Sequence, residues 1–355
     1  MSPVIDVHHH FLPDGVVARL RRKAGGGPRL VDDRISITLH PALSDVDAHL
    51  AAMDEAGVDL ALLTYSGVSV LGPEVCREVN EGLAAVVAAH PGRLRAAAHV
   101  DLEDAGATDE LARCVDDLGF GAVALPSSTP TVALDDPTLD PLWAAIGELD
   151  VPVVLHPALL PRGASTDHGL ERSCARPFDT TVAAVRLVCG VLPRHRSLRV
   201  VFPHCGGTAI FLKGRLQMFF GRPGEPPPSL PRTVAEQARD GLDAIFDELW
   251  SQLWFDTAGT GGWAPAVTFA ASVVGADRLM WGSDFPLESH SAATLRELVT
   301  MVGDLPLPPD ERAAVAGGTA AALLSIPPAG AGAAGAAAVG ASAAGATATR
   351  RAACG

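Results

Sequence analysis

The chain has 355 residues, of which 48% are hydrophobic, and its formal net charge is −14 at pH 7. This size and apolar content suit a globular protein with a large core, whereas the acidic balance argues against nucleic acid and anionic membranes as partners. The 6 cysteines are scattered without a Cys-x-x-Cys pair, which indicates a reducing compartment rather than a disulfide framework. No secretory signal pattern precedes the first strand-like residues, so we expect a cytoplasmic protein that acts on small molecules.

Short apolar runs alternate with helical patterns along the chain, which is typical of repeated βα units around a parallel sheet. Eight strands are expected, at Val4–His10, Val58–Tyr65, Leu94–His99, Ala122–Pro126, Val151–His156, Arg199–His204, Leu253–Ala258 and Arg278–Asp284. Helical periodicity is clearest at Ser44–Ala56, Cys76–Ala89, Asp109–Leu118, Pro141–Leu149, Thr180–Val191 and Ala292–Val302. This pattern predicts an α/β fold, a distorted (β/α)8 TIM barrel with loop insertions over its C-terminal mouth.

An open, doubly wound sheet is the alternative fold. It normally has a glycine-rich phosphate turn after the first strand, where this chain continues with His9–Pro13. Two stretches interrupt the alternation: Ala24–Ala42, expected to form a long loop over the barrel mouth, and the proline-rich Gly221–Pro231. The last residues, 327–355, are almost wholly Ala, Gly, Ser and Thr, which predicts a disordered tail after a barrel of residues 1–326.

The first predicted strand ends in three consecutive histidines. Because successive side chains of a strand point to opposite faces, His8 and His10 are expected to project together, at a spacing that can chelate a divalent metal. His156 ends the fifth predicted strand and Asp284 the eighth, and the carboxyl ends of barrel strands meet at one mouth. These four residues form a candidate metal site, for which zinc is the expected ion and manganese or another first-row ion the alternative.

Other polar residues of the predicted strands are assigned to supporting roles. His204 ends the sixth strand and is expected to act as an acid/base beside the metal-bound water, with a structural role as the alternative. His99 ends the third strand and is expected either to line the substrate pocket or to be structural. Asp6 is expected on the same strand face as His8 but deeper, and His9 is expected to face the helices.

The candidate metal ligands and His204 lie in four segments: Asp6–Pro13, Leu155–Pro157, Pro203–Gly207 and Trp281–Pro286. On the basis of these segments, nearly the whole chain resembles the amidohydrolase superfamily. Within it, the chain is similar to the metal-dependent nonoxidative decarboxylases, which include aminocarboxymuconate-semialdehyde, γ-resorcylate and 6-methylsalicylate decarboxylases. Two further segments, Pro177–Thr181 and Trp254–Ala258, look most like the 6-methylsalicylate type. The resemblance implies the same metal ligands and the same place for His204.

The resemblance also implies substrate-binding residues that spacing does not single out. Arg215 matches an arginine that, in the semialdehyde decarboxylase, reaches into the neighbouring subunit's site and holds a substrate carboxylate, so a homodimer is expected. A surface arginine on a helix is the alternative. Phe178 joins Arg215 and His99 as an expected substrate-binding residue. That decarboxylase has a further arginine where this chain has Thr38–Leu43, which argues here against its particular dicarboxylate substrate.

The reaction implied by the resemblance is nonoxidative decarboxylation of a small aromatic or unsaturated acid, such as an ortho-hydroxybenzoate, with Asp284 or the metal water as proton donor. Neither Lys23 nor Lys213 is near a predicted strand end, so a carboxylated lysine bridging two metals is excluded. A mononuclear hydrolase of a lactone, ester or amide would use the same residues and is the alternative. A catalytically silent binding barrel would be expected to have lost a ligand, and none is missing.

Overall fold

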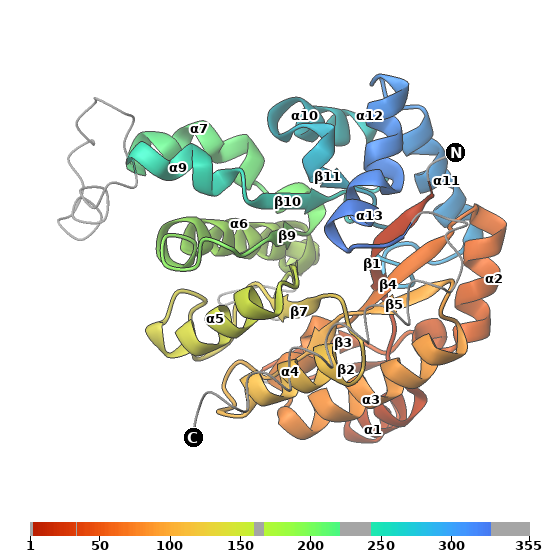
Figure 1. Ribbon diagram of the computed structural model, residues 1–355. Helices are drawn as coiled ribbons and strands as arrows, with labels where there is room; N and C mark the ends of the chain where they lie inside the picture. Colours follow the sequence, from red (N-terminus) through yellow and green to blue (C-terminus); the bar gives the residue numbers. More distant parts are fainter. Residues whose placement is uncertain (1–2, 33, 160–166, 221–242, 328–355) are drawn as a thin grey trace.

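The computed structural model describes residues 3–32, 34–159, 167–220 and 243–327 (Figure 1). The proline-rich stretch 221–231 and the tail predicted beyond residue 327 lie outside these ranges. Across the described part, no helix combines the length and the apolar character that a membrane span requires.

Parallel strands close into a barrel, as the sequence predicts. The strands are β1 (Ile5–His10), β4 (Leu60–Thr64), β5 (Leu94–Ala96), β6 (Ala98–His99), β7 (Val123–Pro126), β8 (Val153–His156), β9 (Val200–Phe202), β10 (Leu253–Asp256) and β11 (Leu279–Met280). One run joins β1, β4 and β5, and a second joins β6 to β11 in order. Only Ala97 separates β5 from β6, so they act as one strand. β11 returns to β1 through a hydrogen bond from Val7 N to Trp281 O of 3.2 Å, which completes the TIM barrel.

Helices surround the barrel on the outside (Figure 1). They include α1 (Asp14–Lys23), α2 (Val46–Ala56), α3 (Pro73–Ala89), α4 (Ala107–Asp116), α5 (Asp140–Leu149), α6 (Arg176–Arg186), α7 (Ala209–Phe220), α9 (Asp243–Trp250), α10 (Ala264–Val274), α11 (Ala292–Gly303), α12 (Pro309–Ala313) and α13 (Thr319–Leu323). The strands read as nearly continuous Val, Leu and Ala runs because both of their faces are buried, one against the barrel interior and one against the helices.

The barrel interior has its own apolar cluster, built from residues in or next to most of the strands. It contains Ile5, Val7, Leu60, Leu62, Ala97, Ala122, Ala124, Val154, Val201 and Met280. Two residues of α13, Ala320 and Leu323, pack against the same cluster. The last described helix therefore covers the end of the barrel away from the histidines and helps to exclude water from its interior.

A β-bulge in β1 changes the faces that strict alternation assigns to its side chains. The pairing with β4 shifts between Asp6 and His9, so that two residues of β1 stand opposite one residue of β4. As a result Val7 and His8 both turn toward the barrel interior or mouth, while Asp6 and His9 lie together on the helix side. The expectation that Asp6 shares the His8 face is therefore wrong. His9 does face the helices, as predicted, and contacts His49 of α2.

Three further expectations are corrected at the mouth of the barrel. The predicted loop Ala24–Ala42 contains an antiparallel hairpin of β2 (Arg29–Val31) and β3 (Ser36–Thr38). His204 and Asp284 do not end strands: β9 stops at Phe202 and β11 at Met280, and each residue follows in a turn with positive φ, of 56° and 57°.

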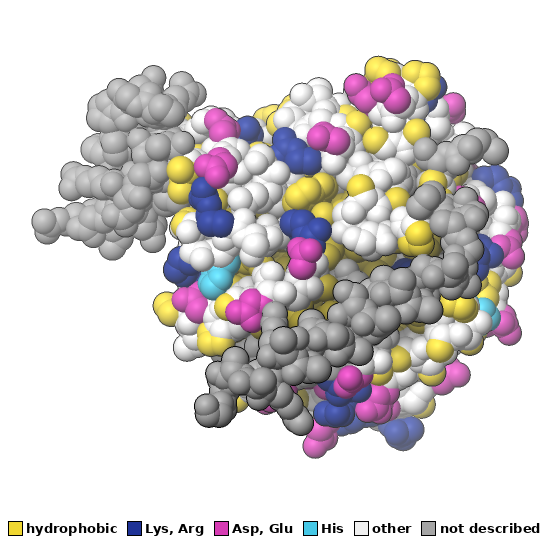
Figure 2. Space-filling view, in the orientation of Figure 1, with side chains coloured by type: hydrophobic (Ala, Val, Ile, Leu, Met, Phe, Trp, Pro, Cys, Tyr) yellow, Lys and Arg dark blue, Asp and Glu magenta, His cyan; other side chains and the backbone are white. Residues whose placement is uncertain are grey.

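On the face seen in Figure 2, the described acidic and basic side chains are interspersed, so this face has no continuous basic surface.

Candidate metal centre

Three imidazoles meet at the carboxyl-terminal mouth of the barrel. His8 and His10 come from β1 and His156 from the end of β8, and their exposed fractions are 2%, 1% and 7%. One ring nitrogen of each lies within 4.8 Å of the corresponding nitrogens of the other two. The structure thus brings together three of the four residues that the sequence suggests as metal ligands.

Backbone carbonyls set the ring orientation of two of these histidines. Nδ1 of His10 lies 3.1 Å from Thr64 O, and Nδ1 of His156 lies 2.8 Å from Pro157 O. Because a carbonyl can only accept a hydrogen bond, Nδ1 carries the proton in both rings and Nε2 keeps its lone pair. Nε2 is therefore the nitrogen that each ring can offer to a metal.

Asp256 at the end of β10 orients the third ring. Its Oδ2 accepts a hydrogen bond from His8 Nδ1 at 2.8 Å, and its Oδ1 accepts from the backbone N of His204 and of Ala258 at 2.9 and 3.0 Å. Burial works to lower the pKa of His8, but the charge and hydrogen bond of Asp256 outweigh it and raise that pKa to about 9. Asp256 has no role in the sequence-based prediction, although a carboxylate at a predicted strand end is the signal that could have marked it.

Asp284 approaches the three imidazoles from the loop after β11. Its backbone N donates to His8 O at 2.9 Å, and its Oδ1 lies 2.8 Å from Nε2 of His10. That contact lacks hydrogen-bond geometry, and neither atom has a hydrogen-bond partner among the described residues. Burial alone would raise the pKa of Asp284, but neighbouring His10 outweighs it and holds the pKa well below its usual range. Two buried polar atoms left unsatisfied this close together would be stabilised by a cation bound to both.

His204 lies beside this group on the short turn η7 (His204–Gly206). Its ring stacks on that of His8, with centroids 5.2 Å apart, and its Nε2 is 3.5 Å from Oδ2 of Asp284. Atoms of His8, His204 and Asp284 lie within 4.8 Å of one another. The ring also packs on the backbone of Gly259, where an added Cβ would lie 2.6 Å from Cγ of His204, so only glycine fits there.

Behind the imidazoles, the carboxylate of Asp6 joins the two segments that carry the ligands. Its Oδ1 accepts hydrogen bonds from the backbone N of His8 and of Ser283 at 3.1 and 3.0 Å, and its Oδ2 accepts from Ser283 Oγ at 2.5 Å. Nδ1 of His9 lies 2.8 Å from the same Oδ2, and Nε2 of His9 lies 2.8 Å from Nδ1 of His49. Asp6 therefore holds the β1 bulge against the loop of Asp284.

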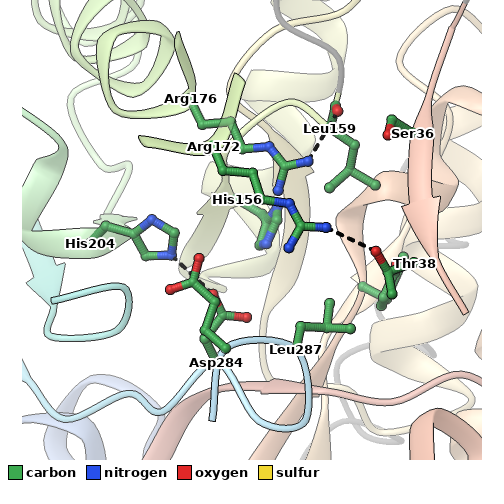
Figure 3. A pocket seen from close by; sticks show the side chains of 11 residues that line it. Ser36, Thr38, His156, Leu159, Arg172, Arg176, His204, Asp284 and Leu287 are labelled. Atoms are coloured by element: carbon green, nitrogen blue, oxygen red, sulfur yellow. Dashed lines mark hydrogen bonds and ion pairs between the residues drawn. The ribbon is translucent and has the colours of Figure 1, made fainter. Parts of the chain in front are cut away.

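Two of the candidate ligands, His156 and Asp284, line a pocket with about 450 Å³ of unfilled space, part of it open to solvent. Figure 3 shows its lining, which includes two arginines whose side chains are directed into the pocket. The lining residues are Ser36, Thr38, Tyr65, His156, Leu159, Arg172, Arg176, His204, Asp284, Leu287 and Glu288. Arg172 and Arg176 were missed by the sequence analysis, because no strand end or motif marks them.

The three residues suggested for substrate binding lie elsewhere in the described chain. His99 is fully buried behind Tyr65, whose backbone N donates to its Nε2 at 2.8 Å, and burial lowers its pKa to about 4. Phe178 is 62% exposed on α6, where it lines a separate surface groove. Arg215 is exposed on α7. None of the three is among the residues that line the pocket within one subunit.

Comparisons with known proteins agree with the resemblance seen in the sequence. The chain is 29% identical over 276 residues to γ-resorcylate decarboxylase of Rhizobium sp. (strain MTP-10005), which covers 72% of this chain and 81% of the relative. It is similar to the crystal structure of 5-carboxyvanillate decarboxylase from Sphingomonas paucimobilis, with a TM-score of 0.74, 25% identity, and coverage of 92% and 100%.

The fold recurs in 5-carboxyvanillate decarboxylase from Novosphingobium aromaticivorans complexed with manganese and 4-hydroxy-3-methoxy-5-nitrobenzoic acid. That structure gives a TM-score of 0.70 at 19% identity, with coverage of 92% and 96%. The family description Amidohydrolase (Amidohydro_2) matches residues 5–326, nearly the whole described barrel. The chain therefore belongs to the amidohydrolase family.

Proposed function

We propose that this protein is a metal-dependent decarboxylase that releases carbon dioxide, without oxidation, from a small aromatic carboxylic acid of the ortho-hydroxybenzoate class. The observation that carries the proposal is the clustering of buried imidazole nitrogens and one carboxylate oxygen at the barrel mouth, where His156 and Asp284 line a pocket together with two arginines. The decarboxylase relatives support this reaction over the hydrolytic alternative, which the same residues could also perform.

The residues present fit a divalent cation, which His8, His10, His156 and Asp284 would hold. Nε2 of His8, Nε2 of His10 and Oδ1 of Asp284 are buried without a hydrogen-bond partner among the described residues, an arrangement that is costly unless a cation satisfies them. Three imidazoles and one carboxylate suit zinc, which remains the expected ion, while manganese is the alternative. When bound, such an ion supplies Lewis acidity to the substrate's carboxylate and its neighbouring oxygen.

His204 and Asp284 are suited to manage the proton that the reaction consumes. Departure of carbon dioxide leaves an electron pair on the ring carbon, which must take up one proton. The two side chains are 3.5 Å apart at their nearest atoms, so a proton held on His204 Nε2 can pass to Asp284 Oδ2 as the substrate enters. Because the pKa of Asp284 is low, its carboxylate holds this proton only while passing it to the far more basic ring carbon, and His204 supplies it.

A homodimer is the proposed assembly, and Arg215 is the residue proposed to serve the partner's pocket. Arg215 stands four residues after Phe211 on α7, so both lie on one helix face. Phe211 is 77% exposed and its ring centroid is 6.3 Å from that of Phe269 on α10, which is 44% exposed; Trp263, just before α10, is 66% exposed. Exposed aromatic side chains gathered in this way are typical of protein interfaces.

The experiment that tests the reaction is an incubation of metal-supplemented protein with a panel of ortho-hydroxybenzoates and a panel of lactones, esters and amides. We expect carbon dioxide release from at least one hydroxybenzoate, with the decarboxylated phenol appearing in equal amount. Hydrolysis of a lactone or ester without carbon dioxide release from any acid would overturn the proposal in favour of the hydrolase.

Two variants link any activity to the site. His8→Ala should lose the metal and the activity together, as measured by elemental analysis and carbon dioxide release. His90→Ala is the control. His90 follows the last residue of α3 and does not line the pocket, so this substitution should change neither the metal content nor the activity. Full activity of a metal-free His8→Ala protein would exclude a role for the ion.

A further inference from the structure

We infer that Arg172 and Arg176 form a second anion-binding subsite in the pocket, so that the substrate carries a second acidic group, such as a carboxylate, besides the one that is lost. This inference rests on the proposed function for the identity of the first acidic group only. It concerns residues of the segment after β8, which the sequence analysis did not assign.

Arg176 is the buried member of the pair. Its side chain is 13% exposed, and its Nη2 donates to Glu171 Oε1 at 2.9 Å and to Leu159 O at 3.2 Å. These contacts fix the guanidinium at the pocket wall. Its Nε is buried and has no hydrogen-bond partner among the described residues. A buried N–H group without an acceptor is costly, and more so on a permanently charged guanidinium. A bound acidic group could supply the acceptor for Nε of Arg176.

Arginines outnumber glutamates at this wall of the pocket. The buried carboxylate of Glu171 is shared, since its Oε2 also lies 3.2 Å from Nη2 of Arg29. One glutamate therefore faces two guanidiniums before Arg172 is added. Among the residues that line the pocket itself, Arg172 and Arg176 are matched in number by Glu288, which is exposed, and by Asp284 of the candidate metal centre.

Arg172 extends the subsite toward the rim. It precedes Arg176 by four residues, on the turn η5 (Glu171–Ala175) that leads into α6, so the two side chains leave the same face. Its Nη2 donates to Thr38 Oγ1 on β3 at 2.9 Å. Figure 3 shows both guanidiniums directed into the pocket that His156, His204 and Asp284 also line.

The contact with Thr38 also bears on the expected substrate. Thr38–Leu43 contains no arginine, which argues from the sequence alone against one particular dicarboxylate. The structure brings an arginine to that place from another part of the chain. Leu159, Leu287 and Tyr65 also line the pocket, with apolar surface that suits a flat ring. A ring with an acidic group at each end matches this distribution.

The test measures equilibrium binding to the metal-loaded protein by isothermal titration calorimetry. The probes are salicylate and the three salicylates with a second carboxylate at ring position 3, 4 or 5. A further probe is the tightest-binding of these three with its second carboxylate replaced by an uncharged carboxamide group. We expect one dicarboxylate to bind at least about tenfold more tightly than salicylate or the carboxamide, as charge-assisted hydrogen bonds allow. Equal affinity for all probes would overturn the inference.

Substitutions then assign the effect to the two residues. Arg176→Gln should weaken the dicarboxylate by about tenfold to a hundredfold, and Arg172→Gln by less because Arg172 is exposed, while salicylate changes by less than about threefold. Arg186→Gln, at the other end of α6, is the matched control and should change nothing. If both ligands weaken equally in the arginine variants, the arginines hold the first carboxylate or support the fold, and the inference fails.

Two further readouts keep the result interpretable. If Arg176→Gln does not fold, Arg176→Lys and Arg172→Gln decide, and an unchanged preference for the dicarboxylate in both overturns the inference. Because binding needs no turnover, a dicarboxylate preference without carbon dioxide release from any acid refutes the proposed function and leaves the subsite intact. Carbon dioxide release from salicylate without a preference for a dicarboxylate refutes the subsite and leaves the proposed function intact.

Discussion

The carboxylate of Asp256 accepts a hydrogen bond from Nδ1 of His8 at 2.8 Å, although the two residues are 248 positions apart in the chain. Both groups are almost completely buried, at 0% and 2% exposure. The same carboxylate accepts from the backbone N of His204. One side chain of β10 thus orients a candidate ligand on β1 and fixes the turn that carries the candidate acid/base.

We predict that Asp256→Asn weakens metal binding by about tenfold to a hundredfold, the usual effect of losing a group that orients a ligand. If the amide oxygen keeps the hydrogen bonds to the backbone, its NH₂ faces His8 Nδ1 and places the ring proton on Nε2. Competition with a chelator measures the metal affinity. Asp247→Asn, which changes an exposed carboxylate near Lys213, is the control, and equal affinity in the two variants would contradict the prediction.

His204→Ala should retain nearly full metal content while losing catalytic rate by about 10²–10⁴, the usual contribution of a positioned acid/base group. The reason is that His8, His10, His156 and Asp284 already supply a four-residue ligand set. Elemental analysis and steady-state rates measured on one preparation check both parts. Loss of the metal would make His204 a ligand, and an unchanged rate would make it structural.

Asp6→Ala should lower the free energy of unfolding by about 3–5 kcal/mol, because it leaves buried donors of Ser283, His8 and His9 without their acceptor. Urea denaturation measures the change. Metal affinity should fall as well, since Asp6 joins the two segments that carry His8 and Asp284. A variant with wild-type stability would show that water or a neighbouring group replaces the carboxylate.

Stability of the protein should fall in mild acid because of His99. Its folded pKa of about 4 lies below the ordinary value of 6.5, so the unfolded chain binds the proton first as the pH is lowered. The part of the free energy of unfolding that depends on neutral His99 is fully present above pH 6.5. It is lost between pH 6.5 and 4, at up to about 1.4 kcal/mol per pH unit. We expect His99→Gln to reduce this slope in urea denaturation at stepwise pH, and His195→Gln to leave it unchanged.

Phe211→Glu should convert the proposed dimer to a monomer, because it places a charge in the exposed aromatic cluster of α7 and α10. Sedimentation velocity measures the mass. If Arg215 serves the partner's pocket, activity should fall with the loss of the dimer. A wild-type monomer that is fully active would contradict the proposed assembly, whatever the effect of the substitution.

The barrel and the composition of the ligand group could be predicted from the sequence alone. Apolar runs of strand length separated by helical patterns are local signals, and they placed all eight strands within a few residues of those observed. The histidines at the ends of β1 and β8 were informative because parallel strands bring their carboxyl ends to one mouth regardless of the details between them.

Only the tertiary structure decided which side chains support the ligands. The bulge in β1 depends on the pairing with β4, so alternation within β1 could not show that Asp6 turns away from His8. The acceptor for His8 comes from β10 and the arginines of the pocket come from the turn before α6. Such contacts join residues far apart in the chain, and their geometry exists only once the barrel has closed.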